Sequence, residues 1–304
     1  MIERKGIILA GGSGTRLAPL TGIVTKQLLP VYDKPMIYYP LSLLMLAGIR
    51  EIAIITDPAS LGLMQKALGT GDELGLRFHY AVQKEPLGLA QAFTICADFL
   101  DGDPVCLVLG DNILYGHHLT ALLRQANGRD VSTVFGVHVR NPQDYGIICL
   151  DKRGRPIRID EKPKEPKSNI AVPGLYFFDH HVVAYAKEVK PSVRGELEIT
   201  SIIERYIEGG RLVVEILGRG FAWIDAGSHS SLLEASNFVE TIERRQSQKI
   251  GCIEEIAHSM GWISDVALLQ FANRYAKSAY GNYLAGLLDS NVPGAFASER
   301  GTPL

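Results

Sequence analysis

The chain of 304 residues is predicted to form an α/β domain on a doubly wound, mostly parallel sheet, with a helical appendage at its C-terminal end. Two patterns predict this architecture. Apolar runs of strand length alternate with helical segments through the first half of the chain, as they do in parallel sheets covered by helices on both faces. After Gly227 the pattern becomes almost entirely helical. No internal repeat interrupts this order, so we expect one core with an appendage.

The first strand and the turn after it indicate a phosphate-binding site. Residues 7–9 form a short, unbroken apolar run, which is typical of a strand buried on both faces of a parallel sheet. Gly11, Gly12 and Gly14 follow directly. A glycine-rich turn after a first strand exposes backbone N–H groups, and these groups bind phosphate. Arg16 adds a fixed positive charge at the same place.

This turn differs from two common phosphate-binding loops. A P-loop has Lys-Ser or Lys-Thr after its last glycine, whereas Thr15 and Arg16 follow Gly14 here. The dinucleotide fingerprint requires a third glycine at the position that Leu17 occupies. The turn therefore predicts a phosphate site of another kind.

Hydrophobic patterning places the remaining elements. In the first half we expect helices at 36–47, 61–68 and 89–99 and strands at 52–56, 78–83 and 105–109. In the second half we expect strands at 131–139, 147–150, 157–159, 172–178, 212–217 and 221–225, the last two completing the sheet, with a loop at 161–169 and a helix at 197–208. In the appendage we expect helices at 231–245, 253–258, 266–277 and 283–288, and a frayed end at 291–304.

Composition limits the class of protein. The chain is 46% hydrophobic and 21% charged, which is ordinary for a globular protein. Its net charge of -2 and the lack of a basic run argue against nucleic-acid binding. Four scattered cysteines predict buried thiols in a reducing compartment. No signal peptide precedes the first strand and no apolar run reaches the ~18 residues of a membrane span, so we expect a cytoplasmic protein.

Polar residues are expected at the carboxyl ends of the strands, where ligands bind in doubly wound sheets. Asp111 and Asp225 each end an apolar strand beside a glycine, and Mg²⁺ is commonly held by one or two carboxylates together with phosphate oxygens. A helix-capping role is the alternative for Asp111. Gln83 also ends a strand, and its amide can read the N3–H and O4 edge of a pyrimidine. An exposed glutamine without a ligand is the alternative there.

Residues 9–17, Leu-Ala-Gly-Gly-Ser-Gly-Thr-Arg-Leu, and residues 26–31, Lys-Gln-Leu-Leu-Pro-Val, resemble the signature of the sugar-1-phosphate nucleotidylyltransferases. The resemblance covers nearly the whole chain. It is strongest to members that use dTTP, on the residues at 110–117 and 165–169. It implies transfer of a deoxythymidylyl group from dTTP to glucose 1-phosphate, giving dTDP-glucose and pyrophosphate. This reaction would depend on Mg²⁺ and would open the synthesis of dTDP-rhamnose or a related sugar.

The resemblance also implies site residues and a division of the chain. The core would span 1–240, with a nucleotide-binding half at about 1–130 and a sugar-phosphate-binding half at about 131–240, and the appendage would span 241–304. The nucleotide would contact Leu9, Gly11, Gly12, Ser13, Gly14, Thr15, Arg16, Lys26, Gln83, Gly88 and Asp111. The sugar phosphate would contact Tyr145, Gly146, Glu161, Lys162, Val172 and Arg194. Asp111 and Asp225 would hold the metal ion.

The implied mechanism is direct in-line attack by the sugar phosphate. Its oxygen is ionised at neutral pH, so catalysis depends on positioning and charge stabilisation. By resemblance, Arg16 would neutralise charge at the α-phosphate and on pyrophosphate, Lys26 would hold the triphosphate, and Lys162 would hold the attacking phosphate. Leu87, Pro173 and Ala226 depart from the residues usual in this family, which leaves the sugar preference open.

The helical appendage must bury its apolar side chains somewhere. One expectation is packing on the core of the same subunit. The other, implied by the resemblance, is an interface of a homotetramer that holds a second, inhibitory nucleotide site. That site would include His117, Arg219, Arg244, Lys249 and Glu255. Three other functions stay open at this point: a nicotinamide oxidoreductase, a non-catalytic nucleotide-sugar sensor, and uridylyl or cytidylyl transfer.

Overall fold

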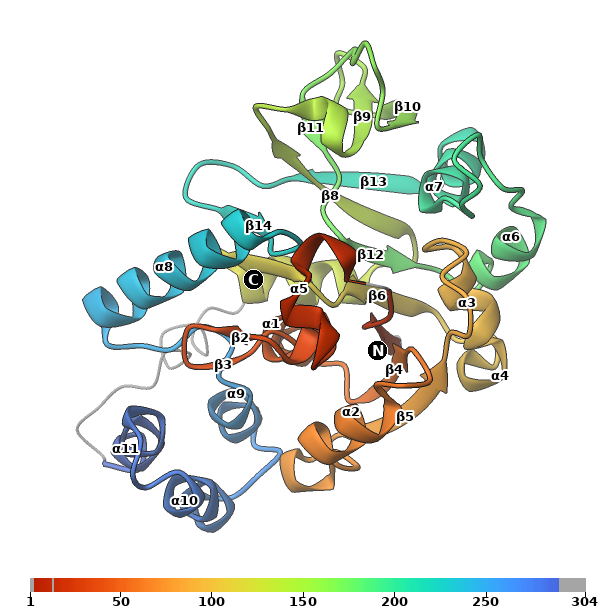
Figure 1. Ribbon diagram of the computed structural model, residues 1–304. Helices are drawn as coiled ribbons and strands as arrows, with labels where there is room; N and C mark the ends of the chain where they lie inside the picture. The colour runs from red at the N-terminus through yellow and green to blue at the C-terminus, as the bar shows by residue number, and fades with distance from the viewer. Residues whose placement is uncertain (1–2, 13, 290–304) are drawn as a thin grey trace.

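A large twisted sheet runs through the molecule and helices cover both of its faces (Figure 1). The computed structural model describes residues 3–12 and 14–289. Ten described strands form this sheet, with β13 (Leu212–Ile216) paired beside β8. The other nine lie in the order β10 (Pro156–Glu161), β9 (Gly146–Leu150), β11 (Ile170–Ala171), β8 (Ser132–His138), β12 (Leu175–Phe178), β6 (Val105–Leu109), β1 (Lys5–Leu9), β4 (Glu51–Thr56) and β5 (Arg77–Val82).

The first half of the chain builds the parallel part of the sheet. β1 lies between β4 and β6, with Ile7 opposite Ala53 on one side and Leu107 on the other. Ile7 and Leu107 are fully buried, as expected for strands covered on both faces. Because β6, β1, β4 and β5 run in one direction, their carboxyl ends meet at one edge. The predicted α/β class is confirmed.

The second half is antiparallel for the most part. β12 pairs antiparallel with both β6 and β8, and β11 joins β8 to β9. Of the single strand expected at 172–178, only residues 175–178 form a strand, β12, and the short strand β11 lies just before the expected range. Pro173 lacks an N–H to donate to a neighbouring strand, and Gly174 packs so closely that an added Cβ would lie 2.5 Å from Leu109 Cγ.

The strand expected to complete the sheet at 221–225 does not join it. β14 (Ala222–Asp225) instead pairs antiparallel with β7 (Asn112–Tyr115) in a separate two-stranded ribbon. A second ribbon is formed by β2 (Pro30–Val31) and β3 (Lys34–Pro35). β7 was not predicted from the sequence, because it has only four residues and begins three residues after the end of β6. Short 3-10 helices lie at η1 (Thr15–Leu17), η2 (Leu20–Gly22), η3 (Lys26–Leu28), η4 (Asp72–Leu74) and η5 (Pro142–Asp144).

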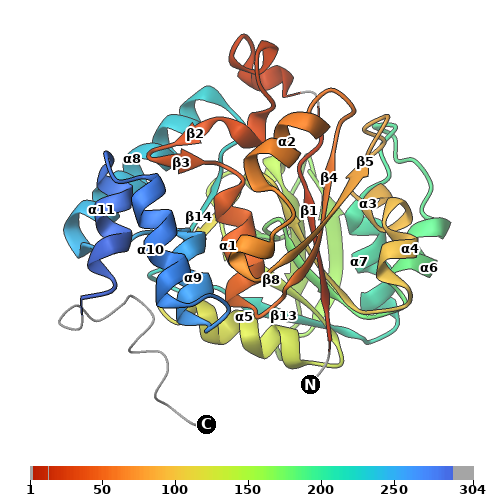
Figure 2. The ribbon, with the colours of Figure 1, turned by 90° about the horizontal axis from the view of Figure 1, so that it is seen from below.

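Helices cover the two opposite faces of the sheet (Figure 2). A hydrophobic core lies between the sheet and the helices on each face. One face carries α1 (Tyr38–Leu46) and α5 (Leu119–Gly128). The other carries α3 (Gln91–Ile95), α4 (Ala97–Leu100), α6 (Val182–Glu188) and α7 (Ile199–Glu208). α2 (Leu61–Leu68) connects β4 and β5 and has the predicted bounds. The single helix expected at 89–99 is divided into α3 and α4 at Cys96.

The appendage packs on the core of the same subunit. It begins within α8 (His229–Gln246) and continues through α9 (Ile253–Ser259), α10 (Asp265–Arg274) and α11 (Ala279–Gly286). Ile253, Ile256 and Leu268 are buried in the same core as Leu44 of α1. Figure 2 shows α9, α10 and α11 gathered beside α1. The predicted frayed end at 291–304 lies outside the described residues. Within the described part of the chain, no helix has the length and apolarity needed to span a bilayer.

Candidate active site

The glycine turn lies directly beyond the carboxyl end of β1. Gly12 and Gly14 have φ angles of 116° and 58°, in the left-handed region that favours glycine. Thr21 Oγ1 donates a hydrogen bond to the carbonyl oxygen of Gly14 at 2.9 Å. An added Cβ at Gly14 would lie 2.8 Å from Thr21 Cγ2, so this part of the turn has no room for a side chain. Ser13, expected to contact the nucleotide, lies outside the described residues.

Arg16 lies in η1, and its guanidinium reaches the far side of the site. A Cβ added to Gly227 would lie 2.9 Å from Arg16 Nη2 and 2.8 Å from Asp225 Oδ1. The guanidinium of Arg16 and the carboxylate of Asp225 therefore flank the same glycine. The fold brings together a cation from the beginning of the chain and a carboxylate from the end of β14.

Lys26 and Asp111 form an ion pair at the centre of the site. Lys26 Nζ lies 2.5 Å from Asp111 Oδ2, and Asn112 Nδ2 donates to Asp111 Oδ1 at 3.0 Å. Burial by itself would raise the pKa of Asp111, but the Lys26 ammonium and the Asn112 amide outweigh it, and the pKa lies below its ordinary value. Asp111 is thus held ionised, and the capping role considered for it is replaced by this pairing.

The second carboxylate responds in the opposite way. Burial, followed by the negative charge of Asp111, raises the pKa of Asp225 to about 6. Lys26 and Arg16 lower the pKa of Asp225 but do not cancel this effect. Two carboxylates that repel each other offer hard oxygen donors to a divalent cation between them, and Mg²⁺ commonly uses one or two protein carboxylates with phosphate oxygens. Asp111 and Asp225 therefore fit the predicted metal ion.

A cavity of about 290 Å³ adjoins this pair on the side of β9 and β10. Tyr145 packs its ring 4.9 Å from the ring of Trp223, whose Nε1 donates to Asn112 Oδ1 at 2.7 Å. The backbone of Gly146 accepts from Val172 N at 2.9 Å. The lining includes all six residues expected to contact a sugar phosphate: Tyr145, Gly146, Glu161, Lys162, Val172 and Arg194.

The cations of this cavity are placed by backbone and carboxylates. Lys162 has a φ of 42°, and its backbone N donates to Tyr145 O at 3.0 Å. Arg194 pairs with Glu161 Oε1 at 3.2 Å and with Glu198 Oε1 at 3.4 Å. Burial and then the charge of Glu198 raise the pKa of Glu161, against the influence of Lys162 and Arg194. The ion pairs with Glu161 and Glu198 therefore hold the side chain of Arg194, which comes from the loop at 192–198, in the wall of the cavity.

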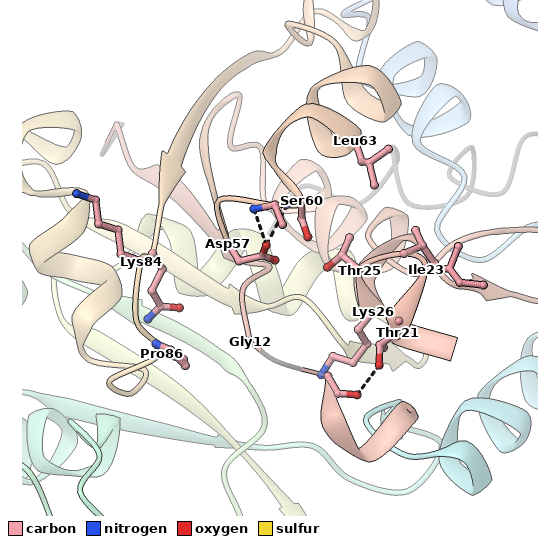
Figure 3. Close-up of a pocket in the computed structure, with 15 residues that line it drawn as sticks. Gly12, Thr21, Ile23, Thr25, Lys26, Asp57, Ser60, Leu63, Lys84 and Pro86 are labelled. Atoms are coloured by element: carbon pink, nitrogen blue, oxygen red, sulfur yellow. Dashed lines mark hydrogen bonds between the residues drawn. The ribbon is translucent and has the colours of Figure 1, made fainter. Parts of the chain in front are cut away.

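A second cavity, of about 370 Å³, lies on the other side of the glycine turn (Figure 3). In Figure 3, Lys84 and Pro86 lie across the cavity from Thr21 and Ile23. Lys26 lines both cavities. A ligand that occupied both cavities would therefore contact the ammonium group of Lys26. The wall residues are Gly12, Gly14, Thr21, Gly22, Ile23, Val24, Thr25, Lys26, Asp57, Ala59, Ser60, Leu63, Gln83, Lys84 and Pro86.

The loops of the two halves of the site are joined by backbone hydrogen bonds. Leu197 N donates to Leu87 O at 2.6 Å, and Ala90 N donates to Leu197 O at 3.0 Å. Gly88 has a φ of 129°, and an added Cβ would lie 2.4 Å from the backbone N of Leu197. Gly88 is therefore required for this close approach. Leu87 contributes its backbone to the joint, while its side chain is 43% exposed.

Comparison with known proteins identifies the family. A profile described as Nucleotidyl transferase matches residues 5–242, from β1 into α8. This chain belongs to the nucleotidyl transferase family. The matched range contains the glycine turn, the Lys26–Asp111 pair, Asp225 and both cavities. The residues of the candidate site therefore lie within the region that the family model matches.

Two relatives with more than half of their residues identical to this chain carry the same name. A Neisseria meningitidis serogroup A protein named glucose-1-phosphate thymidylyltransferase is 54% identical over 285 residues, covering 93% of this chain and 99% of its own. A Xanthomonas campestris pv. campestris protein of the same name is 56% identical over 288 residues, covering 94% and 98%. The solved structure of UDP-glucose pyrophosphorylase with UDP-glucose has a TM-score of 0.70 at 26% identity, covering 80% of this chain and 100% of that one. These nucleotidyl transferases are enzymes, and so is this protein.

Several residues of the site were not expected from the sequence. Asn112 links Asp111 to Trp223, accepting from the indole while it donates to the carboxylate. Glu198 holds Arg194, and Gln91 contacts Gln83 at 2.8 Å. The signal for Asn112 was its position after Asp111, but its partner Trp223 comes from a distant strand. Long-range pairing of this kind leaves no trace in local sequence patterns.

The five residues expected at a second nucleotide site lie in three places. The turn of His117 lies near the Arg219 loop, because a Cβ on the adjacent Gly116 would lie 2.2 Å from Phe221 Cδ1. Arg244 pairs along α8 with Glu240 at 2.7 Å. Lys249 pairs with Asp33 and, at 2.9 Å, with Glu243. Glu255 accepts from Tyr283 Oη at 2.8 Å, and Lys249 N donates to the same Tyr283 oxygen at 3.4 Å, so these two residues share a partner.

Proposed function

We propose that this nucleotidyl transferase transfers a deoxythymidylyl group from dTTP to glucose 1-phosphate, giving dTDP-glucose and pyrophosphate. The observation that carries the proposal is the pair of cavities that share Lys26 as a wall. One holds the glycine turn and Gln83, which suit a triphosphate and a base. The other holds Lys162 and Arg194, which suit a sugar phosphate. The names of relatives at 54% and 56% identity support the same reaction.

The nucleotide site assigns one role to each group. Backbone N–H groups of the glycine turn bind the triphosphate, and Leu9, Gly11, Thr15 and Gly88 shape its surroundings. Gln83 reads the base. Arg16 stabilises negative charge that develops at the α-phosphate and on the leaving pyrophosphate. Lys26 holds the triphosphate while its ammonium stays next to Asp111.

Residues of the second cavity then position the attacking phosphate of the sugar opposite the α-phosphate of the nucleotide. Lys162 and Arg194 offset the repulsion between two anions, and Glu161 accepts hydrogen bonds from sugar hydroxyls. Because the attacking oxygen is already ionised, no side chain has to remove a proton. Fixed cations in a partly buried site stabilise the transition state by electrostatics, which is worth roughly 10²–10³-fold in turnover for one well-placed donor.

Asp111 and Asp225 would hold Mg²⁺. When bound, the ion supplies positive charge to the phosphates of the nucleotide. The raised pKa of Asp225, caused by burial and by Asp111, supports this assignment because a cation between the carboxylates would relieve their repulsion. The core would span 1–240 and the appendage 241–304, as expected from the resemblance.

We also infer a homotetramer in the cytoplasm that serves dTDP-rhamnose synthesis and carries a second nucleotide site at His117, Arg219, Arg244, Lys249 and Glu255. Exposed apolar side chains on the outer faces of α8 and α10 support an interface: Leu233 is 63% exposed and Val266 is 68% exposed. Light scattering tests the assembly, and a monomer would contradict it. Inhibition by dTDP-rhamnose that is purely competitive with dTTP would contradict the second site.

The proposed reaction is tested by pyrophosphate release with glucose 1-phosphate and each of dTTP, UTP, CTP, ATP and GTP. Turnover should be highest with dTTP and should require both substrates. Release of pyrophosphate with none of the five would indicate a non-catalytic binding protein instead. A preference for UTP or CTP would assign the chain to uridylyl or cytidylyl transfer.

A further inference from the structure

The proposed function assigns the reading of the base to the side chain of Gln83. It follows β5, and its backbone N donates to Thr56 O at 2.9 Å, which fixes it beside β4. Its side chain is buried and lines the nucleotide cavity. A carboxamide has an accepting end and a donating end, so its orientation decides which base edge it can match.

Two hydrogen bonds determine that orientation. The backbone N of Leu87 lies 3.3 Å from Oε1 of Gln91. Because a backbone N–H can only donate, Gln91 must present its oxygen there. The same oxygen lies 2.8 Å from Nε2 of Gln83, so Gln83 must present its nitrogen to Gln91. The Oε1 atom of Gln83 is left facing Gly11, where an added Cβ would lie 2.9 Å from it.

The position of Gln91 is itself fixed by the fold. Gln91 is the first residue of α3, and its carbonyl oxygen accepts from Thr94 Oγ1 at 2.9 Å. The preceding Ala90 donates to Leu197 O at 3.0 Å, and Leu87 accepts from Leu197 N. The donor at Leu87 and the acceptor at Gln91 are thus held by the same joint between the two halves of the site.

We propose that Gln91 is a positioning residue that sets base specificity by holding Gln83 with its oxygen toward the base. This inference rests on the proposed function. A base with an N3–H next to a C4 carbonyl, such as thymine or uracil, offers a donor to Oε1 of Gln83 and an acceptor to the second hydrogen of Nε2. Cytosine has an unprotonated N3 and a C4 amino group. Its N3 acceptor would face the acceptor Oε1 of Gln83, and its amino donor would face the donor Nε2.

The test compares dUTP with dCTP, which differ only at this edge of the base. Gln91→Met keeps the length of the side chain and removes the acceptor, so Gln83 becomes free to rotate. The ratio of kcat/KM for dUTP over dCTP should fall by about tenfold or more, the order expected when a mismatched buried polar pair is relieved. The ratio for dTTP over dUTP should stay unchanged, because those bases share the edge that Gln83 reads.

Gln91→Glu is the matched control, because its carboxylate accepts from both Leu87 N and Gln83 Nε2. The ratio for dUTP over dCTP should remain within about threefold of that of the unmodified protein. A purely structural role for Gln91 would lower turnover with all nucleotides equally and would leave both ratios unchanged. Calorimetric titration with dUTP and dCTP gives the same comparison for a variant that binds but does not turn over.

Gln91→Lys gives a second, independent variant. A donor at this position would pair with Oε1 of Gln83 and turn Nε2 toward the base, so dCTP should gain relative to dUTP. An unchanged ratio of dUTP over dCTP in both Gln91→Met and Gln91→Lys would overturn the inference. A fall of this ratio in Gln91→Glu as large as the fall in Gln91→Met would overturn it as well. Failure of the unmodified protein to use dTTP would instead contradict the proposed function.

Discussion

Arg16 places a permanent charge between the glycine turn and Asp225, as its approach to Gly227 shows. A guanidinium does not lose its proton in proteins, and its planar fork can contact two phosphate oxygens at once. Lys26 by contrast is paired with Asp111. At the scale of single residues, the guanidinium of Arg16 can thus stabilise negative charge that develops on the phosphates during the reaction. The positive charge of Lys26 is already balanced by the carboxylate of Asp111.

Arg16→Ala should therefore lower turnover much more than nucleotide binding. We expect a decrease in kcat of roughly 10²-fold, because a donor aimed at transition-state charge is lost. The dissociation constant for dTTP should change less. Steady-state kinetics and calorimetry measure the two effects, with Arg16→Lys as the control that keeps the charge. Turnover within threefold of the unmodified protein would show that Arg16 does not stabilise the transition state.

Removal of divalent metal should abolish turnover without unfolding the chain. Asp111 keeps Lys26 as a partner, and Lys26 and Arg16 both act on Asp225, so neither carboxylate is left without a neighbouring cation. In EDTA, activity should be lost and circular dichroism should be unchanged, and added Mg²⁺ should restore turnover. Full activity in EDTA would contradict the metal assignment.

Asp225→Asn should shift the Mg²⁺ concentration needed for half-maximal turnover upward.

At the scale of elements, a buried charge cluster joins the β2–β3 ribbon to the appendage. Lys34 Nζ lies 2.5 Å from Asp33 Oδ1 and 2.9 Å from Glu243 Oε1, and its side chain is 1% exposed. Lys249 pairs with the same two carboxylates. Burial alone would lower the pKa of Lys34, but Glu243 and Asp33 raise it above its ordinary value. Because the ribbon follows the Lys26 loop in the chain, this cluster anchors that loop to α8.

Lys34→Met should destabilise the protein strongly. The substitution preserves volume but leaves the carboxylates of Asp33 and Glu243 with one partly buried cation, Lys249. Breaking a buried ion pair costs about 3–5 kcal/mol. Urea unfolding at pH 7 measures the change. Lys34→Met combined with Glu243→Gln should recover part of the loss, because one unpaired charge is removed. A loss below about 0.5 kcal/mol would mean that the cluster has no role in stability.

The elements that could be predicted from the sequence are those with strong local signals. The apolar runs of β1 and β6 are buried on both faces, and α2 begins and ends where expected. β14 was predicted as a strand but assigned to the main sheet, and β7 was not predicted, because these two short strands pair with each other rather than with the main sheet. The position of Asp225 beside Asp111 depends on that pairing, which sets Asp225 opposite Asn112. Asp111 and Asp225 were predicted to lie at the same site, but the ribbon that brings them together was not predicted.

At the scale of the whole molecule, two halves of different topology meet across the site. The parallel half supplies the glycine turn and Gln83, and the antiparallel half supplies Lys162 and Arg194. The backbone bonds between Leu87 and Leu197 join them at the mouth of the site. The resemblance of short motifs could predict the residues of both halves of the site. The backbone hydrogen bonds that join the halves depend on contacts between distant loops, so no local sequence pattern predicts them.

Gly88→Ala should disturb both halves together. A φ of 129° and an approach of 2.4 Å to Leu197 N leave no room for a Cβ. The loops at 87–90 and 192–198 should separate, so the KM for dTTP and the KM for glucose 1-phosphate should both rise, by about tenfold or more. Gly69→Ala is a matched control, since Gly69 also has a positive φ, of 63°, and a Cβ there would meet no atom within 4 Å. A rise in only one KM would show that the halves act independently.

The central claim is that an oxygen of the sugar phosphate becomes bonded to the α-phosphorus of dTTP while the sugar keeps its own phosphate, and one isotope experiment tests it. Glucose 1-phosphate with all its phosphate oxygens labelled with ¹⁸O is incubated with unlabelled dTTP and Mg²⁺, and the products are analysed by mass spectrometry. Because the bond that breaks lies between the α- and β-phosphates of dTTP, every labelled oxygen should appear in dTDP-glucose and none in pyrophosphate. Label in pyrophosphate, or in free phosphate released with the sugar's transfer, would contradict the mechanism.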